Sequence, residues 1–161
     1  MEKRINLQEL EPDAYKAMYA LEKYLQKSEI SKTHLELIKI RASQINGCAY
    51  CLQMHTQDAL KQGETNQRIF LLNAWRETTL YTQEERTILA MTEEITLINQ
   101  KGLSDQTYKK ALELFTENHV GQIIMAIVTI NAWNRMAIST LRPLPEEKYL
   151  ECFSKQIKPS T

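Results

Sequence analysis

The stretch Asn46-Gly47-Cys48-Ala49-Tyr50-Cys51-Leu52-Gln53-Met54-His55 determines how the rest of the chain is interpreted. Gly47 predicts the end of one helix and Cys48 the start of the next, because glycine readily adopts the left-handed backbone found just after a helix. The first turn of a helix has unpaired backbone N–H groups and a partial positive charge, and both stabilise a thiolate. Cys51 and His55 lie four residues apart, so on a helix they share a face. The stretch therefore predicts a redox centre with two thiols and a nearby base.

The cysteine pair has three possible interpretations. Free cysteines are often small buried hydrophobic residues, but this does not explain the spacing or the glycine before them. A structural zinc site is the second, with Cys48, Cys51, His55 and Glu36 as four ligands. Such sites usually use a second Cys/His pair, and Cys152 is the only other cysteine in the chain. We therefore favour a redox-active dithiol without a bound metal or cofactor, because the disulfide itself stores two electrons.

Length and composition restrict the class of protein. The chain has 161 residues, which suits a single domain over residues 1–161. Hydrophobic residues make up 43% and charged residues 25%, as in a soluble globular protein. The 20 basic residues balance 20 acidic ones, so no net charge favours nucleic acid or an anionic membrane. No apolar run could span a bilayer, and the first residues lack the apolar core of a signal peptide, so we expect a cytoplasmic protein without a membrane partner.

Hydrophobic periodicity predicts an all-α fold of about six to eight helices. The sequence has only four glycines and four prolines, and strand-like alternation is almost absent. Ser31 is a predicted N-cap, and Thr82 with Glu85 forms a predicted capping box. The expected helices cover about 12–27, 32–46, 48–62, 66–77, 83–100, 105–116 and 119–140.

Both ends of the chain are expected to lie outside this helical body. Residues 1–10 form an arm whose apolar side chains could pack onto the body or onto a partner chain. Pro143 and Pro145 are expected to end the last helix, because proline cannot continue one. Residues 146–161 are expected to form a partly ordered tail, in which Cys152 is incidental.

The constellation of Glu36, then Cys48 twelve residues later, Cys51 and His55 resembles that of the carboxymuconolactone decarboxylase and alkylhydroperoxidase AhpD-like family. The resemblance covers roughly residues 30–140, which we expect to be the core of the domain. Further segments resemble the single-domain, peroxidase-related branch of the family: Asn73-Ala74-Trp75-Arg76-Glu77-Thr78, residues 81–86 and Ile130-Asn131-Ala132-Trp133-Asn134-Arg135.

The resemblance implies an all-helical protein that assembles into homo-trimers or homo-hexamers and reduces hydroperoxides. By this resemblance, Cys51 attacks the peroxide, Cys48 resolves the sulfenic acid to a disulfide, and Glu36 and His55 form a proton relay. An external dithiol, either a thioredoxin-like or a lipoyl-bearing protein, would reopen the disulfide. Where the best-studied members carry a histidine, this chain has Tyr50, which cannot act as a base near pH 7.

The residues alone leave open which cysteine attacks. The electrostatics of a helix end favour Cys48, because it lies nearer the N-terminus. The resemblance and the base one turn further along favour Cys51, because His55 could deprotonate the thiol and then protonate the leaving alkoxide. We choose Cys51 as the attacking thiol.

Two other functions remain as alternatives. Lactone decarboxylation is the family's other chemistry, but it does not rely on a cysteine pair. A non-enzymatic redox-sensing or zinc-binding oligomeric helical module is the second alternative.

The other notable side chains have structural interpretations. Trp75 and Trp133 are expected in the core or at an interface rather than at a cofactor. Arg76 and Arg135 are each expected to pair with a helix glutamate. The charged run Glu84-Glu85-Arg86 is expected to be a solvated first turn.

Overall fold

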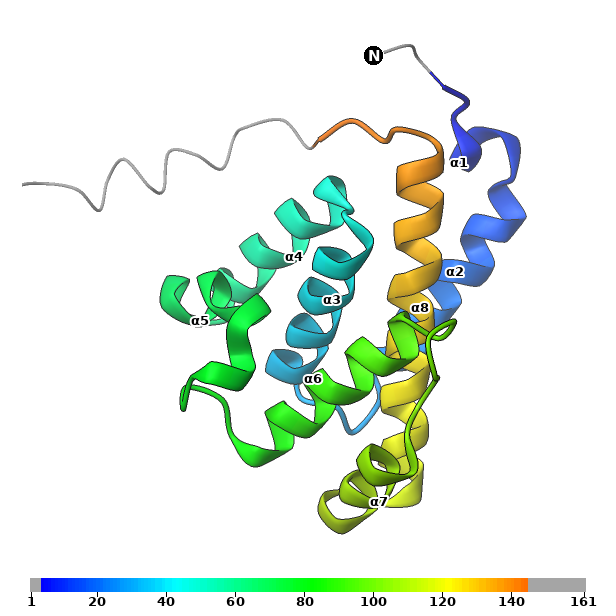
Figure 1. Cartoon of the computed structure of the whole chain (residues 1–161). Helices are drawn as coiled ribbons and strands as arrows, with labels where there is room; N and C mark the ends of the chain where they lie inside the picture. The colour runs from blue at the N-terminus through cyan, green and yellow to red at the C-terminus, as the bar shows by residue number, and fades with distance from the viewer. Residues whose placement is uncertain (1–3, 145–161) are drawn as a thin grey trace, which may run out of the picture.

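A computed structural model describes residues 4–144 of the chain, and within this range it contains eight α-helices, one 3-10 helix and no strand (Figure 1). The expected all-α fold is therefore confirmed. The expected tail and Cys152 lie outside the described residues, as does Pro145. The elements are α1 (Leu7–Leu10), α2 (Pro12–Leu25), α3 (Lys32–Asn46), α4 (Ala49–Lys61), α5 (Asn66–Phe70), η1 (Leu72–Glu77), α6 (Gln83–Thr96), α7 (Asp105–Leu114) and α8 (Glu117–Ser139).

Helix α3 lies at the centre of the fold and packs against α4, α6 and α8 (Figure 1). Because neighbours cover it on several sides, it buries polar as well as apolar side chains. Each fully buried aliphatic side chain contributes roughly 1.5–3 kcal/mol through the hydrophobic effect. Its buried residues are Leu35, Glu36, Leu37, Ile38, Ile40, Ala42 and Ser43.

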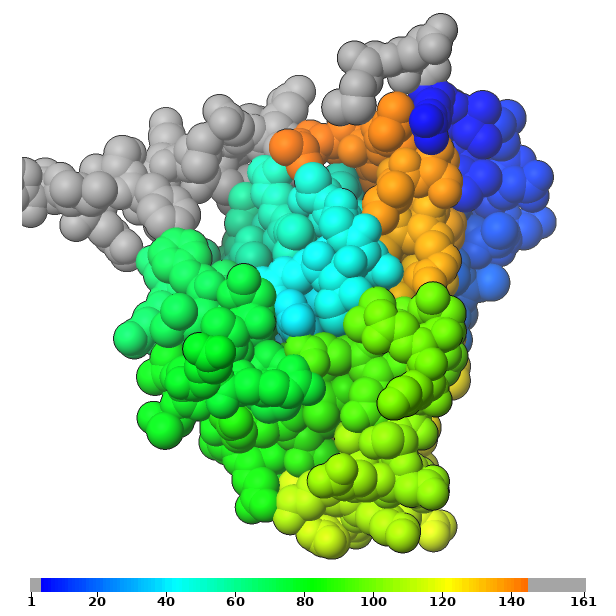
Figure 2. Space-filling model, viewed as in Figure 1, coloured from blue at the N-terminus to red at the C-terminus, as the bar shows by residue number. Residues whose placement is uncertain are grey.

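Helix α8, the longest of the described helices, contacts α2, α3, α4, α6 and α7. In the space-filling view, α6 and α7 cover its lower part, while its orange C-terminal end is visible beside α2 (Figure 2). Among residues 4–144, none of the helices combines the length and the apolar character that crossing a membrane requires.

Local signals explain the helix ends that the sequence predicted best. The Ser31 hydroxyl accepts a hydrogen bond from the His34 backbone N–H, and Thr82 and Glu85 form the complete capping box. Gly47 ends α3 with φ of 69°, in the left-handed region that glycine tolerates.

Two predicted boundaries were wrong. The helix expected over 66–77 is divided into α5 and η1, and η1 itself has a kink at Ala74. Helix α6 ends at Thr96 rather than near residue 100. The end of α8 at Ser139 lies within one residue of the prediction, and Leu141 follows it in a left-handed conformation with φ of 48°. The Arg142 N–H then bonds the Ala137 carbonyl, which closes a turn typical of a helix C-terminus.

The N-terminal arm is held on the body of the protein at the end of α8. Arg4 Nη1 donates to the Ser139 carbonyl oxygen at 2.8 Å, where a cation also complements the helix dipole. Ile5 and Leu10 are nevertheless 59% and 62% exposed, so these two side chains contribute little to the core.

Candidate active site

The two thiols lie where the sequence predicted them, at the start of a helix. Cys48 is the N-cap of α4, and the Cys48 N–H donates to the Ser43 carbonyl at 3.0 Å as the chain leaves α3. Both cysteines are reduced and lie in an apolar cluster, with exposed fractions of 1% for Cys48 and 2% for Cys51. Burial in such surroundings disfavours a thiolate, so any thiolate here needs specific hydrogen-bond donors.

The pKa values of the two thiols are shifted in opposite directions. The Cys51 thiol donates a hydrogen bond to the Cys48 sulfur, and this bond is the main cause that lowers the pKa of Cys48 to about 6 despite burial. Further hydrogen bonds from the backbone N–H groups of Cys51 and Tyr50 and from the Asn134 side chain act in the same direction. The same hydrogen bond, together with burial and the adjacent charge of Cys48, raises the pKa of Cys51. The surroundings therefore favour negative charge on Cys48 and a retained proton on Cys51.

Asn134 is a site residue that the sequence analysis did not single out. It comes from α8, is fully buried, and acts on both sulfurs. Its Nδ2 donates to the Ser43 hydroxyl at 2.9 Å, and its Oδ1 accepts from Asn46 Nδ2 at 2.8 Å. These two bonds fix which end of the amide faces the thiols. The available signal was an asparagine inside the most apolar helix of the chain.

Glu36 and His55 form a buried pair between α3 and α4. His55 Nδ1 lies 3.0 Å from Glu36 Oε2, and the two residues are 6% and 7% exposed. With Glu36 as a carboxylate, Nδ1 carries the hydrogen and Nε2 keeps a free lone pair for proton exchange. Lys39 Nζ lies 3.8 Å from Glu36 Oε1 and 3.3 Å from Glu22 Oε2, so the carboxylate is also balanced by a cation.

The structure does not join the two parts of the predicted site directly. Within residues 4–144, no hydrogen bond connects His55 to either sulfur. In the same range, no three His, Cys, Asp or Glu side chains come together as metal ligands do. The four residues proposed as zinc ligands are thus arranged as two separate pairs: Cys48 with Cys51, and Glu36 with His55.

The remaining predicted side chains have structural contacts. Trp75 is 4% exposed and donates to Glu93, which also pairs with Arg76 as expected. Trp133 donates to a Glu22 carboxylate oxygen at 3.0 Å.

Two of these structural expectations were wrong. Arg135 bonds the Asn131 carbonyl and side-chain oxygens rather than a glutamate. Within the charged run, Glu85 is only 6% exposed, because it forms an ion pair with Arg68 at 2.6 Å.

Comparison with known proteins identifies the family. The sequence profile of the carboxymuconolactone decarboxylase family matches residues 12–94. The chain is 45% identical over 139 residues to the uncharacterized protein YdfG of Bacillus subtilis (strain 168), covering 86% of this chain and 95% of that protein. The chain belongs to the carboxymuconolactone decarboxylase family.

Solved structures agree with this assignment. One similar structure is that of ATU0492 from Agrobacterium tumefaciens, a protein of unknown function provisionally described as the antioxidant defence protein AhpD. It matches with a TM-score of 0.86 and 38% sequence identity, and the match covers 89% of this chain and 99% of ATU0492. An uncharacterized peroxidase-related protein from Silicibacter sp. TM1040 has a TM-score of 0.73 and 23% identity, covering 82% of this chain and 70% of that one. The second likeness concerns the fold alone, which is AhpD-like.

Proposed function

We propose that this protein is a thiol-dependent peroxidase that reduces hydroperoxides through Cys48 and Cys51. The observation that carries the proposal is the buried thiol pair at the start of α4, where the Cys51 thiol, backbone N–H groups and the Asn134 side chain lower the pKa of Cys48. A thiolate is the form of cysteine that attacks peroxides, so this pair is reactive at neutral pH. The provisional description of the 38% identical ATU0492 as an antioxidant protein supports the same chemistry.

Cys51 attacks in this mechanism, and Cys48 acts first as its base. Proton transfer across the S–H···S hydrogen bond turns Cys51 into a thiolate; the raised pKa of Cys51 opposes this transfer, so the choice of Cys51 rests on the family resemblance and not on the proton distribution. The Cys51 sulfur attacks one peroxide oxygen, the O–O bond breaks, and the products are a Cys51 sulfenic acid and an alkoxide. The alkoxide takes the proton from Cys48 and leaves as the alcohol.

The resolving step uses the low pKa of Cys48. Its thiolate attacks the Cys51 sulfenic sulfur, the S–O bond breaks, and a disulfide and hydroxide form. Hydroxide then needs one proton, which comes from solvent: the free lone pair of His55 Nε2 accepts a proton from a water molecule of the solvent and passes it on to the hydroxide. An external dithiol, thioredoxin-like or lipoyl-bearing, returns two electrons and two protons by thiol–disulfide exchange.

The test is a count of free thiols before and after one equivalent of cumene hydroperoxide, in a Cys152→Ser background. We expect two thiols to be lost per chain, with one equivalent of cumyl alcohol formed. Cys51→Ser should abolish peroxide consumption, whereas Cys48→Ser should give one turnover and a sulfenic acid that dimedone traps. The reverse pattern would exchange the two roles, and no thiol loss at all would contradict the proposal.

The proposed setting is a cytoplasmic homo-oligomer, either a trimer or a hexamer. A disulfide that must be reopened after each turnover suits a reducing compartment. Large apolar side chains remain exposed on two packed helices, with exposed fractions of 46% for Tyr19, 45% for Tyr24, 46% for Val128 and 41% for Ile138. Such a surface is typical of subunit contacts. Light scattering of the purified protein would measure the mass, and a monomer would contradict this part of the proposal.

A further inference from the structure

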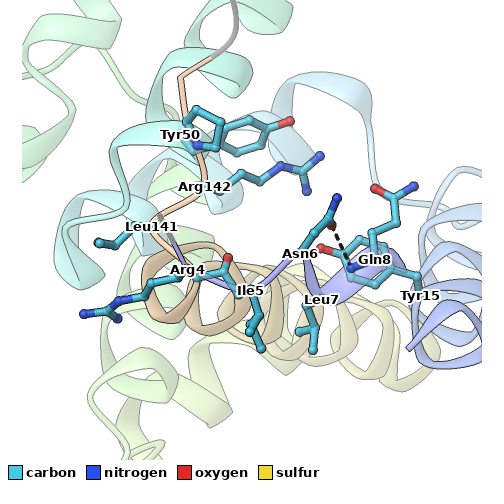
Figure 3. Close-up of a pocket in the computed structure, with 11 residues that line it drawn as sticks. Arg4, Ile5, Asn6, Leu7, Gln8, Tyr15, Tyr50, Leu141 and Arg142 are labelled. Carbon is cyan, nitrogen blue, oxygen red and sulfur yellow. Dashed lines mark hydrogen bonds between the residues drawn. The ribbon is translucent and has the colours of Figure 1, made fainter. Parts of the chain in front are cut away.

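A cavity of about 770 Å³ lies beside the thiol-bearing helix, between the N-terminal arm and the end of α8 (Figure 3). Its volume lies within the range of about 300–1,000 Å³ that is usual for small-molecule sites. Tyr50, which follows Cys48 by two residues and directly precedes Cys51, forms part of its wall. The cavity is therefore next to the proposed redox site along the chain, although neither cysteine lines it.

Among the lining residues that the structure describes, apolar walls are combined with a single available cation. Arg4 and Arg142 both line it, and no acidic residue is among its described lining residues. The Arg4 guanidinium donates to the Ser139 carbonyl and points away from the Arg142 guanidinium (Figure 3). Arg142 stacks on the Tyr50 ring with its guanidinium carbon 4.3 Å from the ring centroid, and among residues 4–144 it pairs with no carboxylate.

The backbone beside the cavity sets the position of Arg142. Leu141 has φ of 48°, a conformation that is unfavourable for a residue with a side chain. The chain turns away from the axis of α8 at this point, and the Arg142 guanidinium lies beside Tyr50 and points toward Asn6 and Gln8 (Figure 3). Backbone strain of this kind is concentrated at functional sites, where the rest of the structure maintains it.

We propose that this cavity binds an amphipathic organic carboxylate, with Arg142 as the anchor for the carboxylate and the apolar walls holding the hydrocarbon part. A guanidinium presents a planar set of donors that matches a carboxylate, and stacking on an aromatic ring keeps it oriented. One cation suits one negative charge, which favours a carboxylate over a doubly charged phosphate. One part of this proposal rests on the proposed function: if the protein is a peroxidase, the carboxylate that it binds as a substrate is an organic acid hydroperoxide.

The first test is binding, which does not depend on catalysis. Decanoate and decan-1-ol are titrated calorimetrically into the full-length wild type, Arg142→Gln and Arg76→Gln. Arg76 is the matched control, because it stacks on Trp75 at 4.1 Å but lies outside the cavity. We expect Arg142→Gln to weaken decanoate binding by about tenfold to a hundredfold, the loss of a charge-assisted hydrogen bond. Arg76→Gln should bind like the wild type, and decan-1-ol should not distinguish the proteins.

The second test asks whether the bound acid is the substrate. An organic acid hydroperoxide should have a higher kcat/KM than its methyl ester, and Arg142→Gln should reduce this ratio, with Arg142→Lys intermediate. Equal decanoate affinity in the wild type and Arg142→Gln, or no decanoate binding to the wild type, would overturn the proposal. If decanoate binds through Arg142 but no hydroperoxide is consumed, the cavity assignment stands and the proposed function fails.

Discussion

Replacing Cys51 with alanine should raise the pKa of Cys48, because the Cys51 thiol is the main reason that this pKa is about 6. A hydrogen bond to a charged group contributes about 1.5–3 kcal/mol. Since about 1.4 kcal/mol corresponds to one pH unit, the pKa of Cys48 should rise by about one to two units. At pH 7 the thiolate fraction would then fall from about nine-tenths to between about a half and a tenth.

The assay is a pH titration of the far-ultraviolet absorbance of the thiolate, which does not require reagent access to a buried sulfur. A Cys152→Ser background removes the third thiol. Cys51→Ser is the matched control, because its hydroxyl can still donate to Cys48, and its titration should stay close to a pKa of about 6. If Cys51→Ala also titrates near that value, the helix start alone stabilises the thiolate and the reasoning from the shared proton is refuted.

Three further predictions concern stability, measured by urea denaturation. The reduced protein should become more stable by about 3 kcal/mol as the pH rises from 6 to 8.5, because in this range Cys48 holds a proton in the unfolded chain but not in the folded protein. Above pH 8.5 it should become less stable, because folded Cys51 retains a proton that the unfolded chain loses. A stability that does not change with pH would contradict the different pKa values of the two thiols. Asn134→Ala should destabilise the protein by about 2–4 kcal/mol, since its buried partners lose their hydrogen bonds, and an unchanged midpoint would mean that water replaces the amide. Leu141→Gly should stabilise the fold by up to about 1 kcal/mol by removing left-handed strain, whereas destabilisation would mean that packing of the leucine side chain outweighs the strain.

Much of the fold could be predicted because its signals are local. Ser31 and Gly47 bound α3 through contacts within a few residues, and the start and end of this helix match the sequence prediction. The thiol positions at the start of α4 follow from the same glycine. The family resemblance placed Glu36 and His55 in one proton relay, and in the structure the two residues meet directly at 3.0 Å.

The errors arise where distant parts of the chain meet. Glu85 was expected in solvent because a charged run usually is, but Arg68 lies close to it only in the folded protein. Asn134 follows the cysteines by more than eighty residues, and no local pattern relates it to them. The turn after α8 places Leu141 in a left-handed conformation that the sequence would assign to glycine. Local propensity does not contain this tertiary information.

The hydrogen bonds of Asn134 explain why the site favours a thiolate over two neutral thiols. A side-chain amide has two N–H donors and one oxygen acceptor. Its oxygen is occupied by Asn46 and one donor by Ser43, so the remaining donor can serve the sulfurs. If the amide were reversed, its oxygen would face the thiolate and both neighbours would lose their bonds. The buried polar contacts between α3 and α8 therefore orient a dipole toward the sulfur charge before any substrate binds, which is the electrostatic preorganisation that catalysis requires.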